Sequence, residues 1–339
     1  MLVRIFGQKT LKSEIKEHCF NAKTYFSRNR FIKQKSMIVP KGKLIIIGGA
    51  VDMGSNLSSH EDIVRPNYLK FFEQGILKRI ITESEHQTNS KVEVITTASQ
   101  IPEMVAVEYI NAFNQLNVEQ VNILDIKSRE DAAKAENLER IRAADVVMFS
   151  GGDQLRLSSI FGGTEFLQIL KSRYQKEKLV VAGTSAGAAA ASTNMIYRGQ
   201  SNKALIKGEV QMTAGLGFID SVIIDTHFVQ RGRIGRLLYA VASNPGMLGI
   251  GLGEDAGLLI TEGTKMEAIG SGLTILVNGR KMGETNIYDV EMGSPVSIKN
   301  MRVSVMSIFD KYDLSANQLS IKKITKPEEG VFVVPDDKS

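Results

Sequence analysis

Apolar runs alternate with amphipathic stretches between residues 43 and 182. The runs are four to seven residues long and fit buried strands, whereas the stretches between them show helical spacing. Strands are predicted at 43–49, 92–98, 121–126, 145–149 and 179–182, and helices at 68–81, 102–116, 129–141 and 165–176. Strands separated by helices of this length indicate a mainly parallel sheet with helices on both faces.

The pattern changes after residue 195. Short apolar runs bounded by glycine-rich turns predict strands at 222–225, 248–252, 257–260 and 273–277. Their pairing is expected to be antiparallel or mixed. With no internal repeat and no clear linker, we expect one α/β domain with a β-rich C-terminal part.

The composition sets limits on size and compartment. The chain has 339 residues, 43% of them hydrophobic, which is enough for one large core or two modest domains. No apolar run approaches the roughly 20 residues of a membrane span. Cys19 is the one cysteine, which excludes a disulfide framework and a cysteine-based metal site. A reducing compartment is therefore expected, and we predict a cytoplasmic protein.

The positive charge is concentrated at the N-terminus. Residues 1–43 contain eleven Lys or Arg and two Glu, so of the formal charge of +5 the other residues contribute 5 − 9 = −4. We predict a basic extension over 1–40, one folded domain over 41–318 and a C-terminal tail over 319–339. The extension is a flexible or helical appendage, sequence upstream of a true start at Met37, or a targeting segment. The body is acidic, so no nucleic-acid partner is expected.

Residues 179–191 read LVVAGTSAGAAAA, an apolar strand followed at once by small helix formers. Gly183 and Gly187 flank Ser185 and suit a sharp strand-to-helix turn. A serine at such a corner exposes its hydroxyl beside the first N–H groups of a helix, as a nucleophile requires. The alternative is a serine that only caps the helix.

A serine nucleophile needs a base, and His227 is the histidine that follows Ser185. The interval of 42 residues is too short for the α/β-hydrolase order, which places an acid between the two. The orienting carboxylate has five candidates by position: Glu209, Asp220, Asp225, Glu254 and Asp255. Spacing does not choose among them, although an approach from an adjacent strand favours Glu254.

Two further groups surround this predicted site. Gly151 and Gly152 leave backbone N–H groups unhindered, and Gly152 with Ala186 is predicted to form an oxyanion hole, the alternative being a plain turn. Arg231, Arg233 and Arg236 follow His227 and predict recognition of carboxylates, the alternative being a solvated face. Neither a metal nor an organic cofactor is predicted: histidines do not cluster, and Gly249, Gly251 and Gly253 have no helix after them.

Four segments together resemble a known family. FSGGDQ at 149–154, GTSAGA at 183–188, DTHFVQRGRIGRL at 225–237 and GIGLGED at 249–255 are similar to cyanophycinase, a serine peptidase family that includes aspartyl dipeptidase. The resemblance covers roughly residues 40–315. It implies a three-layer α/β/α sandwich like that of class I glutamine amidotransferases. It also implies a triad of Ser185, His227 and Glu254.

The resemblance also implies a substrate. Cyanophycin is a polyaspartate backbone with arginine joined to each side-chain carboxyl, and the family cleaves it to β-Asp-Arg dipeptides. The positions implied to bind substrate are Gln154, Asp225, Thr226, Arg231, Arg233 and Arg236. The family usually has Gln where this chain has Thr226, which leaves other β-aspartyl substrates, or a binding protein without turnover, as alternatives. A homodimer is also implied.

Overall fold

The computed structural model describes residues 39–54 and 71–323. These residues belong to one compact unit. The predicted extension 1–40 lies outside the described residues apart from its last two positions. Of the predicted tail, residues 319–323 are described. The last strand, β15 (Gln318–Ser320), crosses the predicted boundary at 318.

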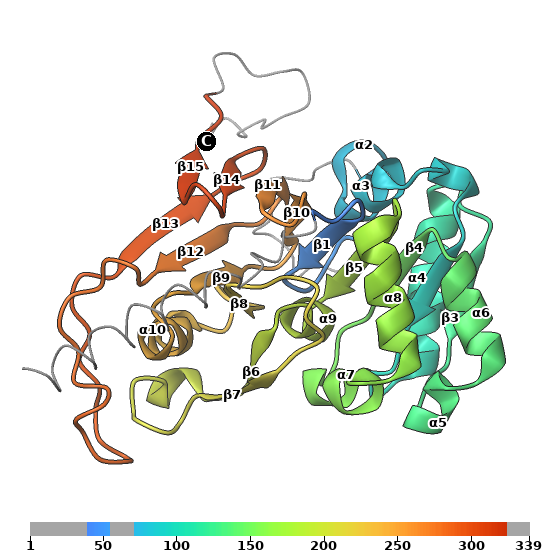
Figure 1. The fold of residues 1–339 in the computed structure, drawn as a ribbon. Coiled ribbons are helices and arrows are strands. Elements are labelled where there is room, and N and C mark those ends of the chain that lie inside the picture. Colours follow the sequence, from blue (N-terminus) through green and yellow to red (C-terminus); the bar gives the residue numbers. More distant parts are fainter. Residues whose placement is uncertain (1–38, 55–70, 324–339) are drawn as a thin grey trace, which may run out of the picture. The chain divides into compact units, whose positions relative to one another are not determined.

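A nine-stranded sheet forms the centre of the described unit (Figure 1). Its order is β15-β14-β11-β10-β1-β5-β4-β2-β3, and β1, β5, β4, β2 and β3 are parallel neighbours. The parallel strands are β1 (Lys43–Ile47), β2 (Val92–Ile95), β3 (Val121–Leu124), β4 (Val146–Phe149) and β5 (Val180–Thr184). The others are β10 (Ala256–Thr261), β11 (Lys265–Gly270), β14 (Lys311–Asp313) and β15. The predicted α/β fold with a mainly parallel core is confirmed.

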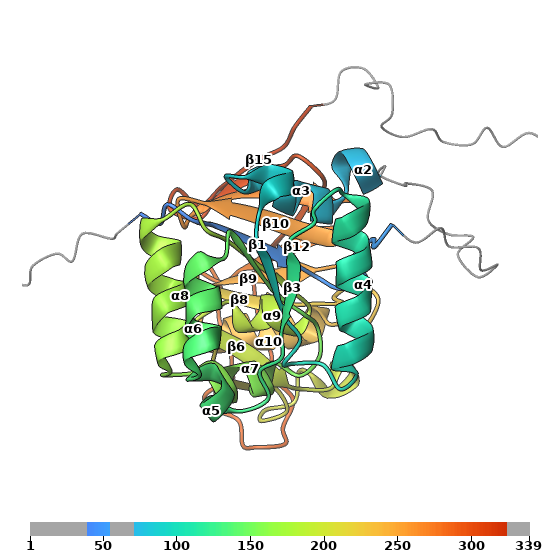
Figure 2. The ribbon, with the colours of Figure 1, turned by 90° about the vertical axis from the view of Figure 1, so that its right-hand side faces the viewer.

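Helices cover both faces of the parallel part, as Figure 2 shows. One face packs against α3 (Ile76–Glu83), which follows the short α2 (Phe71–Gln74), and against α4 (Pro102–Gln115). The other face packs against α6 (Ala135–Ala143), α7 (Gln154–Phe161), α8 (Glu165–Lys176) and α9 (Ala186–Ala190). Side chains alternate between these two apolar cores along each strand, so the strands are buried on both faces.

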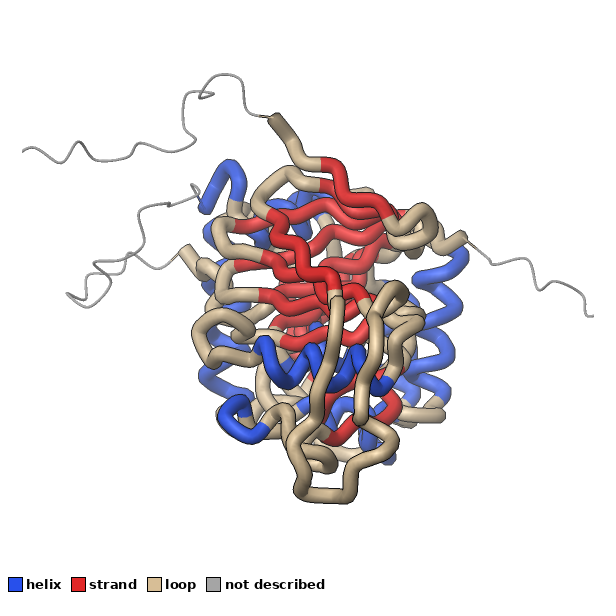
Figure 3. Tube along the Cα trace, turned by 90° about the vertical axis from the view of Figure 1, so that its left-hand side faces the viewer, coloured by secondary structure: helices blue, strands red, loops and turns tan. Residues whose placement is uncertain are grey.

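A separate four-stranded sheet carries much of the β-rich part. Its order is β13-β12-β9-β8, where β8 and β9 are parallel and the other pairs antiparallel, so the predicted mixed pairing is confirmed. The strands are β8 (Val222–Asp225), β9 (Leu248–Leu252), β12 (Thr274–Asn278) and β13 (Arg302–Met306). Helix α10 (Ile234–Ser243) packs on β8 and β9. From the left-hand side of Figure 1, which faces the viewer in Figure 3, strands and loops dominate the view.

Several details differ from the sequence predictions. The predicted helix 129–141 is two helices, α5 (Arg129–Ala132) and α6, because Ser128 and Asp131 form a capping box around a short first helix. Helices α7 and α10 were not predicted. Neither was the hairpin of β6 (Asn194–Arg198) and β7 (Gln211–Ala214). The run 257–260 joins the large sheet as β10, whereas 222–225 belongs to the smaller one.

Candidate active site

Ser185 lies in a tight turn between β5 and α9. Its backbone has φ 50° and ψ −103°, a strained conformation for a residue with a side chain. A Cβ on Gly183 would lie 2.5 Å from the carbonyl carbon of Gly187, and one on Gly187 would lie 2.6 Å from the Phe149 oxygen. The Ser185 N–H donates to the Ile47 oxygen at 2.9 Å. Close backbone packing therefore fixes the corner, which is the turn that the sequence predicts.

His227 approaches the serine from the four-stranded sheet. It lies two residues after β8, with φ 48°, and its N–H donates to the Gly48 oxygen at 2.9 Å. The Ser185 Oγ and His227 Nε2 atoms are 2.8 Å apart. Gly49 makes room for the ring, because a Cβ there would lie 2.2 Å from the imidazole Cε1. A loop after β1 thus shapes the contact between the two sheets.

Glu254 meets the other side of the imidazole. It lies two residues after β9, and β9 pairs in parallel with β8, so both side chains leave the same edge of the smaller sheet. The His227 Nδ1 and Glu254 Oε1 atoms are 3.4 Å apart. The Glu254 N–H also donates to the side chain of Gln230 at 3.2 Å. Serine, histidine and carboxylate therefore stand in series, the arrangement in which an acid orients a general base.

The surroundings of His227 favour its neutral form. Burial and the nearby charge of Arg231 hold the pKa of the imidazole below its usual 6.5, and Glu254 only partly offsets them. A neutral imidazole has the free lone pair that removes a proton from a serine hydroxyl. The electrostatics thus suit a general base at neutral pH.

Gly151 and Gly152 adjoin the serine because β4 and β5 pair in parallel, with Phe149 beside Gly183. A Cβ on Gly151 would lie 3.4 Å from the Ser185 Cβ. Gly152 has φ 139°, and a Cβ there would lie 2.0 Å from the Ala98 oxygen, so this loop requires glycine. Ala186 opens α9, where N–H groups have no acceptor within the helix.

The predicted substrate residues fall into two groups. The Asp225 side chain is 2% exposed and accepts from Arg236 Nε at 2.9 Å and Nη2 at 2.5 Å. Arg233 Nη1 donates to Asp225 at 3.3 Å and to the Thr226 oxygen at 2.9 Å. Burial also lowers the pKa of Arg233. Asp225, Arg236 and the buried Thr226 thus hold the loop that carries His227, and their contact with substrate stays a prediction.

Arg231 and Gln154 are outside the ion-pair network of Asp225. Arg231 is exposed and is close enough to His227 for its charge to lower the imidazole pKa. Gln154 begins α7, and its side-chain amide donates to the Ile196 oxygen at 2.9 Å, which ties α7 to β6. Arg231 therefore combines exposure with proximity to His227.

Asp255 supports the site in a way that the sequence did not reveal. Its carboxylate accepts from the Ser271 hydroxyl at 2.5 Å, the Ser271 N–H at 3.1 Å and the Asp52 N–H at 3.4 Å. Its own N–H donates to the Gly49 oxygen at 2.9 Å. Burial raises the pKa of the Asp255 carboxyl, although the bonds from Ser271 counter this. The residue after Glu254 therefore holds the loop that touches the His227 ring.

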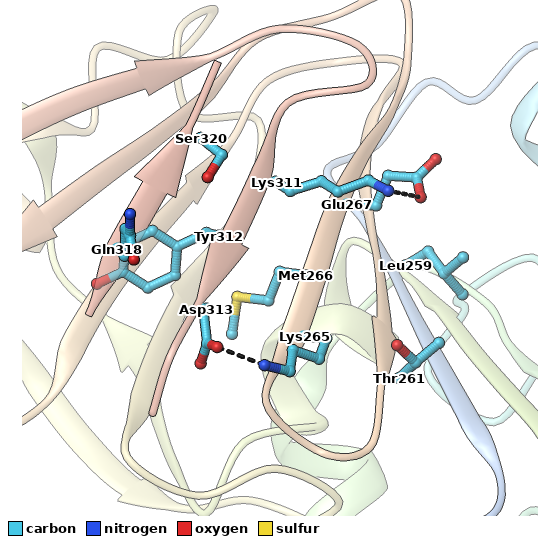
Figure 4. A pocket seen from close by; sticks show the side chains of 10 residues that line it. All are labelled: Leu259, Thr261, Lys265, Met266, Glu267, Lys311, Tyr312, Asp313, Gln318 and Ser320. Atoms are coloured by element: carbon cyan, nitrogen blue, oxygen red, sulfur yellow. Dashed lines mark hydrogen bonds and ion pairs between the residues drawn. The ribbon is translucent and has the colours of Figure 1, made fainter. Parts of the chain in front are cut away.

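A hollow of about 300 Å³ lies away from these residues, on the face of β10, β11, β14 and β15 (Figure 4). Its charged side chains pair with one another: Lys265 with Asp313, and Lys311 with Glu267 at 3.9 Å. Among the described residues, no group of three or more His, Cys, Asp or Glu is arranged to hold a metal ion. No helix in the described ranges is long and apolar enough to span a membrane.

An α/β fold with a serine, a histidine and a carboxylate in series defines a serine-type hydrolase. The family model of peptidase family S51 matches residues 70–268. The chain is 35% identical over 274 residues to a cyanophycinase of Trichormus variabilis, which covers 81% of this chain and 86% of that protein. It is 35% identical over 234 residues to a cyanophycinase of Synechococcus elongatus, covering 69% and 73%. The chain belongs to peptidase family S51 and is a serine peptidase.

A solved structure of a peptidase from an acI-B1 Actinobacterium shares the fold. It aligns with a TM-score of 0.52 and 19% identity over 80% of this chain and 98% of that one. At this identity the similarity supports the architecture alone. The α/β fold with a β-rich C-terminal part is thus shared with another peptidase.

Proposed function

We propose that this peptidase hydrolyses cyanophycin to β-Asp-Arg dipeptides through Ser185, His227 and Glu254. The observation that carries the proposal is the series of contacts from the Ser185 Oγ to His227 Nε2, 2.8 Å, and from His227 Nδ1 to Glu254, 3.4 Å. The names of the relatives supply the substrate. The predicted cytoplasmic location and homodimer remain predictions.

In the proposed reaction the Ser185 oxygen attacks the scissile carbonyl while His227 Nε2 takes the hydroxyl proton. Glu254 accepts the Nδ1–H bond, which fixes the tautomer and stabilises the imidazolium. The negative oxygen of the tetrahedral intermediate receives hydrogen bonds from the N–H groups of Gly152 and Ala186. His227 then gives its proton to the leaving amine, and water hydrolyses the acyl-enzyme by the same steps in reverse order.

The proposed recognition of the substrate rests on Arg231 and Arg233, which follow His227 in the sequence. Arg231 is exposed beside His227, and we assign it to a carboxylate of the substrate. Arg233 belongs to the same loop, with its guanidinium half-buried against Thr226 and Asp225. In this proposal Asp225 and Arg236 act by keeping that loop in position, and contact of Gln154 with the substrate remains a prediction.

The test is incubation with cyanophycin and with a panel of β-aspartyl dipeptides, followed by mass spectrometry of the products. We expect β-Asp-Arg from the polymer with the wild-type chain and none with Ser185→Ala. Release from other β-aspartyl peptides but not from cyanophycin would assign a different isopeptide substrate, the alternative that Thr226 raises. Dipeptide release by Ser185→Ala at the wild-type rate would overturn the proposed nucleophile.

A further inference from the structure

A hollow of about 250 Å³ opens beyond the carboxyl ends of β2 and β3. Residues that follow these two strands line it, together with the start of α4 and Arg156 from α7. Ser185 follows β5, which is parallel to both strands in the same sheet, so the hollow and the nucleophile share one edge. Ligands of parallel α/β sheets bind along this edge.

The distance to the nucleophile suits an extended peptide. In the order β5-β4-β2-β3 the hollow lies two to three strands from Ser185. Neighbouring strands are about 4.8 Å apart, so the separation is roughly 10–15 Å, a length that about three to four residues of extended chain cover. The loop after β4 lies between them: Gly151 faces Ser185, whereas Asp153 N–H donates to the Ala98 oxygen at 2.9 Å. A single loop thus separates the hollow from the serine.

The charges in the hollow are of both signs. The Arg156 Nε–H donates to the Thr97 oxygen at 2.9 Å, which fixes the planar guanidinium at the wall. Lys127 and Asp125 are paired at 2.9 Å, with side chains 58% and 59% exposed. The hollow therefore presents the Arg156 guanidinium and an exposed ion pair of Lys127 and Asp125. The N-terminus of the 14-residue α4 adds positive potential.

We propose that this hollow is a second substrate subsite, which binds a unit of the polymer a few residues from the bond that is cut. The inference rests on the proposed function, since the ligand is the polymer named there. Each unit of that polymer carries one free arginyl carboxylate and one guanidinium, which match the two signs of charge in the hollow. Arg156 pairs with the carboxylate, and Asp125 pairs with the guanidinium by exchanging its exposed partner Lys127. A short substrate that ends near Ser185 does not reach these residues, so the subsite favours long chains over short ones.

The experiment compares cyanophycin polymer with the shortest β-Asp-Arg oligomer that the wild-type chain cleaves. Arg156→Gln removes the charge and keeps a side-chain donor for Thr97, and Asp125→Asn removes the opposite charge. For each variant we expect the KM for polymer to rise about 5- to 20-fold, since a charge-assisted hydrogen bond is lost. The kcat, and the KM for the short oligomer, stay at wild-type values. Arg156→Glu raises the polymer KM further.

Arg302→Gln is the matched control, since Arg302 is an exposed arginine on β13 of the other sheet. An unchanged polymer KM in Arg156→Gln and Asp125→Asn overturns the subsite and leaves the proposed function intact. Equal rises for polymer and short oligomer also overturn it, because the effect is then a disturbance of the catalytic site. A wild-type chain that releases no dipeptide from polymer contradicts the proposed function and the subsite together.

Discussion

The proposed nucleophile Ser185 and the proposed base His227 come from two sheets that hold them by different means. On the side of the nine-stranded sheet, Ser185 is fixed by backbone packing, with Gly183 against Gly187 at distances that exclude a Cβ. On the side of the four-stranded sheet, the loop of His227 is fixed by charge, through the buried pair of Asp225 and Arg236. One half of the site therefore depends on shape and the other on electrostatics.

The two halves are therefore sensitive to different kinds of substitution. Added volume should damage the serine turn and the glycine loops next to it, whereas loss of a charge should damage the loop that carries His227. Both halves also hold strained residues, Ser185 with φ 50° and His227 with φ 48°, so each needs its surroundings to keep the catalytic geometry.

The largest effect is expected on the charged side. Glu254→Gln should lower kcat/KM by about 10⁴-fold, because the amide no longer fixes the imidazole tautomer or stabilises the imidazolium. Steady-state hydrolysis of cyanophycin measures it. Glu209→Gln is the control, since Glu209 is another carboxylate that the sequence offered for this role. Loss of activity in the control with an active Glu254→Gln would reverse the assignment.

The buried ion pair should determine stability on the same side. Asp225→Asn leaves the Arg236 charge buried without its partner, so the free energy of unfolding should fall by about 3–5 kcal/mol. Urea denaturation measures it. Glu165→Gln breaks an exposed ion pair, in which the side chain of Arg142 is 49% exposed and that of Glu165 is 60% exposed. This substitution should change the free energy of unfolding by less than about 1 kcal/mol. Similar losses in both variants would contradict the contrast.

The contact between the two halves responds to volume. Gly49→Ala introduces a Cβ 2.2 Å from the present position of the His227 Cε1, so the ring must move and kcat should drop by about 100-fold. The matched control is Gly163→Ala, because Gly163 also has a positive φ, of 74°, and a Cβ there meets nothing within 4 Å. Wild-type kcat in Gly49→Ala would show that the imidazole is not held where the structure has it.

A smaller effect concerns pH. In the proposed mechanism His227 acts as a base when it is neutral, and the positive charge of Arg231 disfavours the imidazolium and lowers the pKa of His227. Arg231→Gln should therefore raise that pKa and move the acidic limb of the kcat/KM profile, which reports the free enzyme, to higher pH, whereas Arg231→Lys should keep the limb in place. Weaker substrate binding lowers kcat/KM at every pH without moving the limb, so the position of the limb separates the two effects. If the acidic limb of Arg231→Gln stays in place or moves to lower pH, the charge of Arg231 does not lower the pKa of His227.

Much of the serine side could be predicted from sequence because its signals are local. Apolar runs mark β1, β2, β4 and β5, and the glycines around Ser185 mark the turn. The histidine side depends on pairing between distant segments. No local pattern shows that β8 joins β9 in a second sheet, or that the Asp255 carboxylate accepts from Asp52, 203 residues away.

The residues around Asp225 illustrate the same limit. Their sequence predicts contact with a carboxylate, and the structure shows that the carboxylate nearest to Arg236 is the chain's own Asp225. The sequence alone does not show whether an arginine binds a carboxylate of the chain itself or a carboxylate of a substrate. Glu254, by contrast, could be favoured among five candidates, because it ends an apolar strand that was able to lie beside that of His227.

Labelling with a fluorophosphonate, which reacts with an activated serine, tests the proposed nucleophile most directly. We expect one adduct on the peptide that contains Ser185 in the wild-type chain, and its loss in Ser185→Ala and in His227→Ala, with both variants folded by circular dichroism. A folded wild-type chain without an adduct at Ser185, or labelling of Ser185 that is undiminished in His227→Ala, would contradict it.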